Sequence, residues 1–273
     1  MTFQEKLLQT IADKNSLLCV GLDTDPQKIP AILKNEADPI FAFNKQIIDA
    51  TADFAAAFKV NIAFYEALGI SGWQSLQKTM NYLPGKVIKI LDAKRGDIGN
   101  TAQMYARAAF EELKADAVTV NAYMGKDSAE PFLQNPEKGV FFLCLTSNPG
   151  AQDFQYFSNG KMKLYEYIAK TINDWNTRGN CALVVGATHP EELRDLRALV
   201  PDLPFLIPGI GAQGGDLDLA VQYGTNKAGA NALYNSSRAI IYAAADEQFA
   251  VKAAIAAQTT RDALNRARKG KLL

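Results

Sequence analysis

Short apolar runs recur along the chain, and most are followed by a segment in which apolar residues return with helical spacing. The runs that predict buried strands cover 16–24, 55–61, 86–94, 117–123, 139–147, 181–188, 204–210 and a weaker 228–234. The segments that predict helices cover the N-terminal residues, 38–52, 62–82, 99–115, 127–134 and 163–177, with further helices from Pro190 and from about Asp246. Asp38 and Pro39 suit the cap and the first turn of the second helix.

Repeated strand-then-helix units with apolar strands predict a closed parallel (β/α)8 barrel, because right-handed crossovers make that the simplest topology. We expect one domain over 1–273, with an N-terminal helix and a C-terminal helical extension, since no change in composition marks a boundary. An open doubly wound sheet is the alternative, and it is disfavoured because no Gly-x-Gly-x-x-Gly follows the first strand. In such barrels the chemistry lies at the carboxyl ends of the strands.

The composition narrows the function classes. Lys and Arg number 29 and Asp and Glu also number 29, so no overall positive field exists to attract nucleic acid or anionic lipid. We therefore expect no nucleic-acid or membrane partner, and an anionic ligand must be bound by a local site. No apolar stretch is long enough for a membrane span, and the N-terminus lacks a signal-peptide pattern, which predicts a cytoplasmic protein. The cysteines at 19, 144 and 181 stand singly in apolar runs and predict buried thiols, with no metal site.

A concentration of charge follows the third predicted strand. If that strand is regular, its period of two sends Asp92 and Lys94 to the same face. Gly96 then turns the chain and leaves Asp97 near the start of a helix. An ammonium group between two carboxylates is held protonated, which suits a proton donor and not a Schiff-base nucleophile. For Asp-x-Lys alone, a structural ion pair at a strand end is the competing interpretation.

The first two predicted strands also end in charged residues, Asp23 and Lys59. Charged side chains at a barrel core are unfavourable unless they are paired, so these residues and the Asp92 and Lys94 pair predict one alternating network. A substrate carboxylate placed beside an acid of this network would be repelled until it left as CO2. Taken together, these charges indicate a catalytic site.

A candidate phosphate site follows the seventh and eighth predicted strands. Residues 208–216 form a glycine-rich turn that opens a helix, and free backbone N–H groups at a helix start favour an anion. Such a turn is weak evidence by itself. Arg238, which comes after Ser236 and Ser237, can grip a phosphate with two hydrogen bonds and strengthens the prediction.

These motifs resemble those of the orotidine 5′-phosphate decarboxylases, most closely the longer bacterial form. The matching segments are Asp-Ala-Lys-Arg-Gly-Asp-Ile-Gly-Asn-Thr at 92–101, Gly-Leu-Asp at 21–23, Phe-Lys-Val-Asn at 58–61, Leu-Thr-Ser-Asn-Pro-Gly at 145–150 and Pro-Gly-Ile-Gly-Ala-Gln at 208–213. The resemblance implies conversion of orotidine 5′-phosphate to uridine 5′-phosphate and CO2 in pyrimidine biosynthesis, without a metal or organic cofactor. It extends from the first predicted strand to the helix after the eighth.

The resemblance also implies a role for each matching residue in the reaction. Lys94 would give a proton to C6 of the pyrimidine as the carboxylate leaves, and Asp92 would lie against that carboxylate. Lys59 and Asp23 would hold the ribose hydroxyls. Ser147 would contact the pyrimidine, whose pocket Pro208 would line.

The remaining implied roles concern the phosphate and a second subunit. Gln213 and Arg238 would bind the phosphate together with Ser237 or, as the alternative, Ser236, and Gly209 would contact the substrate. The family builds each active site across a homodimer, so Asp97, Ile98 and Thr101 would serve the site of the partner subunit. The stretch after Thr24 and the connection 149–162 are longer than in compact family members, and their role is open.

Two other functions compete with this assignment. A Mg²⁺-dependent sugar-phosphate decarboxylase or aldolase of related barrel type would need a further acid where the second strand offers Lys59. A catalytically silent phosphonucleotide-binding protein would not need the charge network. The histidine at position 189 precedes a proline at a helix start, where a surface or capping role is expected.

Overall fold

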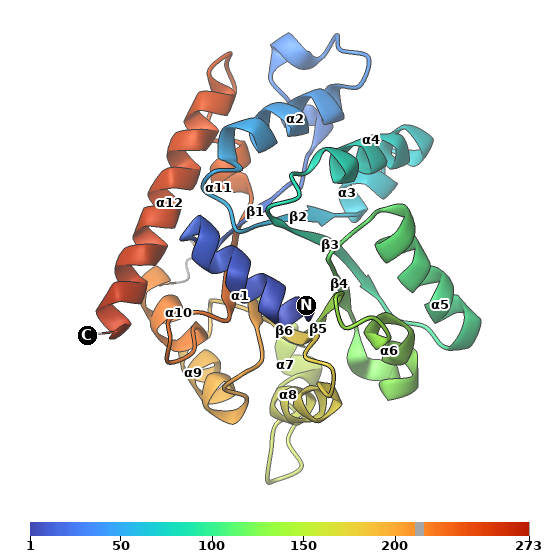
Figure 1. Ribbon diagram of the computed structural model, residues 1–273, viewed down its shortest axis with the longest axis vertical. Helices are drawn as coiled ribbons and strands as arrows, with labels where there is room; N and C mark the ends of the chain where they lie inside the picture. Colours follow the sequence, from blue (N-terminus) through green and yellow to red (C-terminus); the bar gives the residue numbers. More distant parts are fainter. Residues whose placement is uncertain (211–215, 273) are drawn as a thin grey trace.

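The protein, seen here as a computed structural model that describes residues 1–210 and 216–272, contains a closed barrel of eight parallel strands in chain order (Figure 1). The strands are β1 (Leu18–Gly21), β2 (Ala57–Asn61), β3 (Ile88–Arg95), β4 (Ala117–Val120), β5 (Gly139–Leu145), β6 (Cys181–Val185), β7 (Phe205–Pro208) and β8 (Ala232–Ser236). Pairing of β1 with both β2 and β8 closes the barrel. The predicted (β/α)8 fold is therefore confirmed, and the open sheet is excluded.

Helices surround the barrel and follow the predicted order. They are α1 (Phe3–Lys14), α2 (Pro39–Thr51), α3 (Ala63–Glu66), α4 (Gly69–Tyr82), α5 (Gly99–Arg107), α6 (Lys126–Leu133), α7 (Ala151–Phe154), α8 (Leu164–Trp175), α9 (Pro190–Leu199), α10 (Leu217–Gly224), α11 (Arg238–Ile241) and α12 (Phe249–Leu272). The Asp38 carboxylate caps α2 by accepting a hydrogen bond from the N–H of Phe41, with Pro39 in the first turn. Among residues 1–210 and 216–272, none of the helices is long and apolar enough to cross a membrane.

The predicted segments 62–82 and 228–234 differ from the structure in an instructive way. The segment 62–82 forms two helices, α3 and α4, because Gly69 adopts a left-handed backbone with φ of 64° that breaks the helix. The eighth strand begins later than 228–234 because Asn231 also has a positive φ, 58°, just before the strand. The strand also ends later than predicted, so Ser236 is its last residue.

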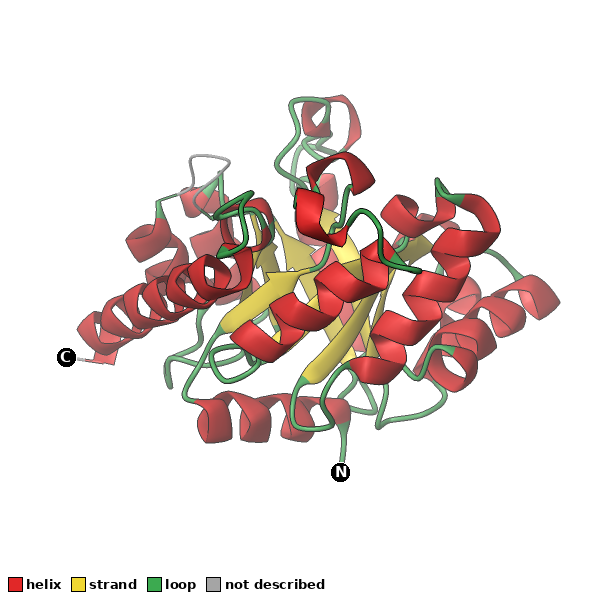
Figure 2. Ribbon diagram, turned by 90° about the horizontal axis from the view of Figure 1, so that it is seen from above, coloured by secondary structure: helices red, strands yellow, loops and turns green. Residues whose placement is uncertain are grey.

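The helix α1 lies across the amino ends of the strands (Figure 2). Its Phe3 is fully buried and meets the ring of Phe141 of β5 edge-on, with ring centroids 5.8 Å apart. Gly139 gives this ring its space, since a Cβ there would lie 2.5 Å from the Phe3 ring. The amino end of the barrel is thus covered, and the carboxyl end is where a ligand can enter.

The long helix α12 runs beside α2 and α10 on one side of the barrel (Figure 1). The contact with α2 is aromatic, since Phe249 at the start of α12 stacks on Phe43 with ring centroids 5.3 Å apart. Both rings are buried. The C-terminal extension is therefore packed against the helical layer of the barrel.

Candidate active site

A cavity of about 310 Å³ opens at the carboxyl ends of the strands. Every strand of the barrel contributes to its wall, either directly or through the residues that follow the strand. The predicted site residues that line it are Asp23, Lys59, Asp92, Lys94, Ser147, Pro208, Gly209, Ser236, Ser237 and Arg238. Residues that lie far apart in the sequence are thus brought to one place.

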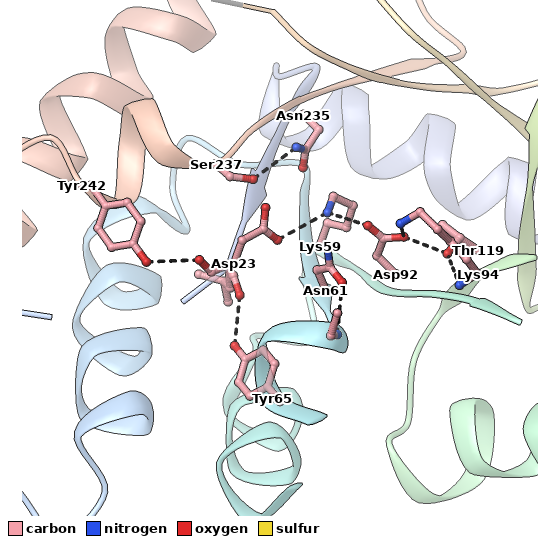
Figure 3. Close-up of polar contacts among 12 residues, drawn as sticks. Asp23, Lys59, Asn61, Tyr65, Asp92, Lys94, Thr119, Asn235, Ser237 and Tyr242 are labelled. Atoms are coloured by element: carbon pink, nitrogen blue, oxygen red, sulfur yellow. Dashed lines mark hydrogen bonds and ion pairs between the residues drawn. The ribbon is translucent and has the colours of Figure 1, made fainter. Parts of the chain in front are cut away.

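Lys59 of β2 links Asp23, which follows β1, with Asp92 of β3 (Figure 3). Its Nζ lies 2.9 Å from Oδ2 of Asp92 and 3.6 Å from Oδ1 of Asp23, and the side chain is buried. Burial by itself would lower the pKa of Lys59, but the charges of Asp92 and Asp23 outweigh it and hold this pKa above its ordinary value. The lysine is therefore a fixed cation.

The Asp92 carboxylate is shared between two lysines. Its second oxygen, Oδ1, accepts hydrogen bonds from Nζ of Lys94 at 2.6 Å and from the hydroxyl of Thr119 at 2.9 Å. Burial would raise the pKa of Asp92, but the charges of Lys59 and Lys94 and their hydrogen bonds hold this pKa well below its ordinary range. Asp92 is thus ionised at neutral pH. The Lys94 side chain is 49% exposed at the cavity, whereas Asp92 is nearly covered.

The strand that carries this pair is not regular, as the prediction had assumed. Leu91 pairs with Val118 and Arg95 with Val120, so three residues of β3, 92–94, lie opposite Thr119 alone. Lys94 has a left-handed φ of 48° within this bulge. Asp92 and Lys94 do meet, but a bulge with a left-handed lysine brings them together, and the simple alternation of a strand does not.

The turn after β3 and the first turn of α5 hold Asp97, Ile98 and Thr101, which the resemblance gives to a partner subunit, and none of them lines the cavity. The Asp97 carboxylate accepts a hydrogen bond from the N–H of Ile98 at 2.8 Å and makes no ion pair with Lys94 in the described part of the chain. The expected placement of Lys94 between two carboxylates thus holds for Asp92 only. Ile98 is 55% exposed and Thr101 is also exposed.

The phosphate end of the cavity combines β7, β8 and the start of α11. Gly209 has a φ of 102°, a conformation that favours glycine, and Arg238 is an exposed residue at the cavity. Gly21 of β1 permits the approach of Ser237, because a Cβ at that position would overlap the Ser237 hydroxyl. Gln213, the remaining predicted phosphate ligand, lies outside the described residues.

Sequence reasoning missed three polar residues at or beside the cavity. Thr119 stands in the otherwise apolar β4, and Asn235 in the weakly predicted β8. Gln155 lies in the long connection 149–162 and makes two hydrogen bonds to Thr146, which precedes Ser147. Oε1 of Gln155 accepts from the Thr146 N–H at 2.8 Å, and Nε2 of Gln155 donates to the Thr146 hydroxyl at 2.7 Å. A threonine within an apolar strand gave no distinct signal for Thr119, and Asn235 lies just beyond the predicted strand 228–234.

The buried side-chain oxygens identify where a ligand could bind. Oδ1 of Asp23 and Oδ1 of Asn235 have no hydrogen-bond partner among the described residues, although Asp23 is within ion-pair distance of Lys59. Both side chains line the cavity. Unsatisfied acceptors of this kind suit the hydroxyl groups of a ligand.

The described residues contain no cluster of three His, Cys, Asp or Glu side chains with the geometry of a metal site. Within the cavity the acids alternate with lysines, which opposes binding of a divalent cation. The three cysteines, Cys19, Cys144 and Cys181, are free and buried, and burial raises the pKa of Cys19 to about 12. His189 stands at the N-terminal cap position of α9 and does not line the cavity.

Comparison with known proteins agrees with this geometry. The model of the orotidine 5′-phosphate decarboxylase / HUMPS family matches residues 16–254. The chain is 52% identical over 270 residues to the orotidine 5′-phosphate decarboxylase of Janthinobacterium sp. (strain Marseille), covering 97% of this chain and 99% of that protein. It is 50% identical over 273 residues to the enzyme of the same name from Dehalococcoides mccartyi (strain ATCC BAA-2100), covering 98% and 99%. The structure of Leishmania donovani OMP decarboxylase superposes with a TM-score of 0.86 at 40% identity, covering 98% of this chain and 99% of that one. The chain therefore belongs to the orotidine 5′-phosphate decarboxylase / HUMPS family.

Proposed function

We propose that this chain decarboxylates orotidine 5′-phosphate to uridine 5′-phosphate and CO2, in pyrimidine nucleotide biosynthesis. The observation that carries the proposal is the alternating series of Asp23, Lys59, Asp92 and Lys94 at the carboxyl end of the barrel. Relatives of about 50% identity over nearly the whole chain bear this enzyme's name.

The charge series suits a decarboxylation that has no electron sink. When the C6 carboxylate leaves as CO2, the electron pair of the broken bond stays on C6. Lys94, whose ammonium is anchored by Asp92, would donate a proton to that carbon, and a preorganised cation would stabilise the negative charge as it develops. The ionised Asp92 would lie beside the substrate carboxylate and repel it. Binding energy from the distant phosphate would offset this repulsion.

Binding of the rest of the nucleotide is supported by the cavity wall. The unsatisfied Oδ1 of Asp23 is an acceptor for a ribose hydroxyl, and Lys59 is a neighbouring donor. We assign the phosphate to Gly209, Ser237 and Arg238, and Gln213 stays a prediction of the resemblance. The other predicted side chains at this cavity are Ser147, Pro208 and Ser236. Ser147 and Pro208 would adjoin the pyrimidine.

We further propose a homodimer in which Asp97, Ile98 and Thr101 complete the site of the partner subunit. Supporting this, Ile98 is 55% exposed and Met104, farther along α5, is 56% exposed, so the segment after β3 carries uncovered apolar side chains. The Asp97 carboxylate makes no ion pair in the described chain. A cytoplasmic location is part of the same proposal, and the unpaired buried cysteines fit a reducing compartment.

The two rival functions are less well supported. A Mg²⁺-dependent enzyme of related barrel type would need acids in place of the cation that Lys59 supplies between Asp23 and Asp92. A silent nucleotide-binding protein would have no use for the Lys94 ammonium at the cavity. The named activity of the close relatives also favours the decarboxylase.

The test is to follow orotidine 5′-phosphate consumption by absorbance and CO2 release in parallel, with EDTA or with Mg²⁺. We expect equal formation of CO2 and uridine 5′-phosphate under both conditions. Turnover that EDTA abolishes and Mg²⁺ restores would favour the metal-dependent rival. Binding of uridine 5′-phosphate without any turnover would favour the silent binding protein.

A further inference from the structure

We propose that Thr119 is a positioning residue for the decarboxylation, which holds the Asp92 carboxylate and the main chain of Lys94 so that the ammonium meets the cavity. The inference rests on the proposed function. It assigns a role in the reaction to β4, a strand from which sequence reasoning drew no site residue.

The Thr119 hydroxyl makes two hydrogen bonds, and each goes to a member of the proposed catalytic pair (Figure 3). It donates to Oδ1 of Asp92 at 2.9 Å and accepts from the main-chain N–H of Lys94 at 2.9 Å. The residue is 1% exposed. A hydroxyl has a single proton to donate, so these two bonds fix its orientation as well as its position.

The backbone of Lys94 explains why such a bond is needed. Three residues of β3 face Thr119 alone, so the regular ladder of main-chain hydrogen bonds is interrupted at this point. Lys94 has a left-handed φ of 48°, which a residue with a side chain adopts only when its surroundings hold it there. The Thr119 hydroxyl accepts the hydrogen bond of the Lys94 N–H in place of a main-chain carbonyl of the neighbouring strand.

The same hydroxyl limits how Asp92 can rotate. The two lysines approach the carboxylate from different strands, with Lys59 on Oδ2 and Lys94 on Oδ1. The bond from Thr119 on Oδ1 completes this set. Without it, both ion pairs would persist, but Lys94 would lose the fixed direction of its ammonium. Catalysis is sensitive to such direction, whereas binding of a product that lacks the carboxylate is not.

Thr119→Val removes the hydroxyl and keeps the shape of the side chain, and Thr119→Ser keeps the hydroxyl. Thr51→Val is a matched control, because the Thr51 hydroxyl is also buried and bonded, to the carbonyl of Ile47, but it lies in α2 away from the cavity. Steady-state kinetics with orotidine 5′-phosphate would give kcat and KM for each variant. Calorimetric binding of uridine 5′-phosphate would report on the rest of the site.

We expect kcat of Thr119→Val to fall roughly tenfold or more, as for the loss of a hydrogen bond to a charged group, with KM and product binding within about threefold of wild type. Thr119→Ser and Thr51→Val should keep kcat within about threefold. If circular dichroism shows that Thr119→Val does not fold, Thr119→Cys replaces it, and the same fall in kcat with little change in KM and product binding is expected.

Unchanged kcat in Thr119→Val, or an equal fall of kcat in Thr119→Ser and Thr119→Val, would overturn the proposal. A fall in product binding as large as the fall in kcat would also overturn it, since Thr119 would then act on the whole site. A wild-type protein without turnover contradicts the proposed function, and with it the reaction that Thr119 is proposed to serve.

Discussion

The Lys94 ammonium lies 2.6 Å from Oδ1 of Asp92, and the strand that joins the two residues is bulged between them. The bulge is what turns the lysine back toward the carboxylate while 49% of its side chain stays accessible at the cavity. Asp92 is also bound by the buried Lys59, which keeps the carboxylate ionised. The pair therefore presents a fixed cation beside a fixed anion, which is what departure of CO2 followed by protonation requires.

Arg238→Ala is expected to raise KM for orotidine 5′-phosphate roughly tenfold or more, because a charge-assisted bond to phosphate is lost. Binding of uridine 5′-phosphate should weaken in parallel, whereas binding of uridine, which has no phosphate, should not change. Arg266→Ala is the control, since Arg266 is exposed on α12 and does not line the cavity. An unchanged KM in Arg238→Ala would remove Arg238 from the phosphate site.

A shared active site predicts that two inactive variants restore each other. In a hybrid dimer of Lys94→Ala and Asp97→Ala subunits, one site has an intact Lys94 and receives an intact Asp97 from the other chain. Equal co-expression should then recover about a quarter of wild-type activity, because half of the dimers are hybrids with one intact site each.

The control for that experiment pairs Lys94→Ala with Asp92→Ala. One subunit supplies both Lys94 and Asp92 to a given site, so no hybrid dimer contains an intact site and no activity should return. Recovery in this control, or none in the first pair, would argue against the placement of Asp97 in the partner's site.

The pH dependence of stability should reveal the buried Lys59. Burial would lower the pKa of Lys59, but Asp92 and Asp23 raise it above its ordinary value in the folded protein. The stabilisation from this group is therefore complete below the unfolded pKa of about 10.4 and is lost as the pH rises through the folded pKa.

Urea unfolding of wild type and Lys59→Met, compared between pH 7 and pH 11, measures this contribution. The unfolding free energy of wild type minus that of the variant should be constant up to about pH 10 and should fall above it. A difference that grows with pH in that range would mean that the pKa of Lys59 is lowered.

Most of the fold could be predicted because each strand is an apolar run that ends in polar residues. The run 139–147 corresponds to β5, Gly139–Leu145, and 181–188 contains β6, Cys181–Val185. The errors lie where single residues adopt a left-handed backbone, as at Gly69 and Asn231. A left-handed backbone at a single residue leaves the spacing of apolar residues unchanged, so the hydrophobic pattern does not reveal it.

The charged residues of the cavity could be predicted because charge at the end of an apolar strand is unusual. Thr119 could not be predicted as a site residue, because threonine is common in strands and the role of Thr119 depends on a bulge in the neighbouring strand. Gln155 is a similar case. It reaches back to Thr146 from a connection whose path the sequence leaves open.

The most direct test of the central claim is the turnover of Lys94→Ala with orotidine 5′-phosphate, measured together with its binding of uridine 5′-phosphate. Lys252→Ala, an exposed lysine on α12, is the control for loss of a positive charge. We predict that Lys94→Ala releases no measurable CO2 while it still binds the product, because the proton donor is missing and the phosphate and ribose contacts remain. Substantial CO2 release by a folded Lys94→Ala protein would contradict the account.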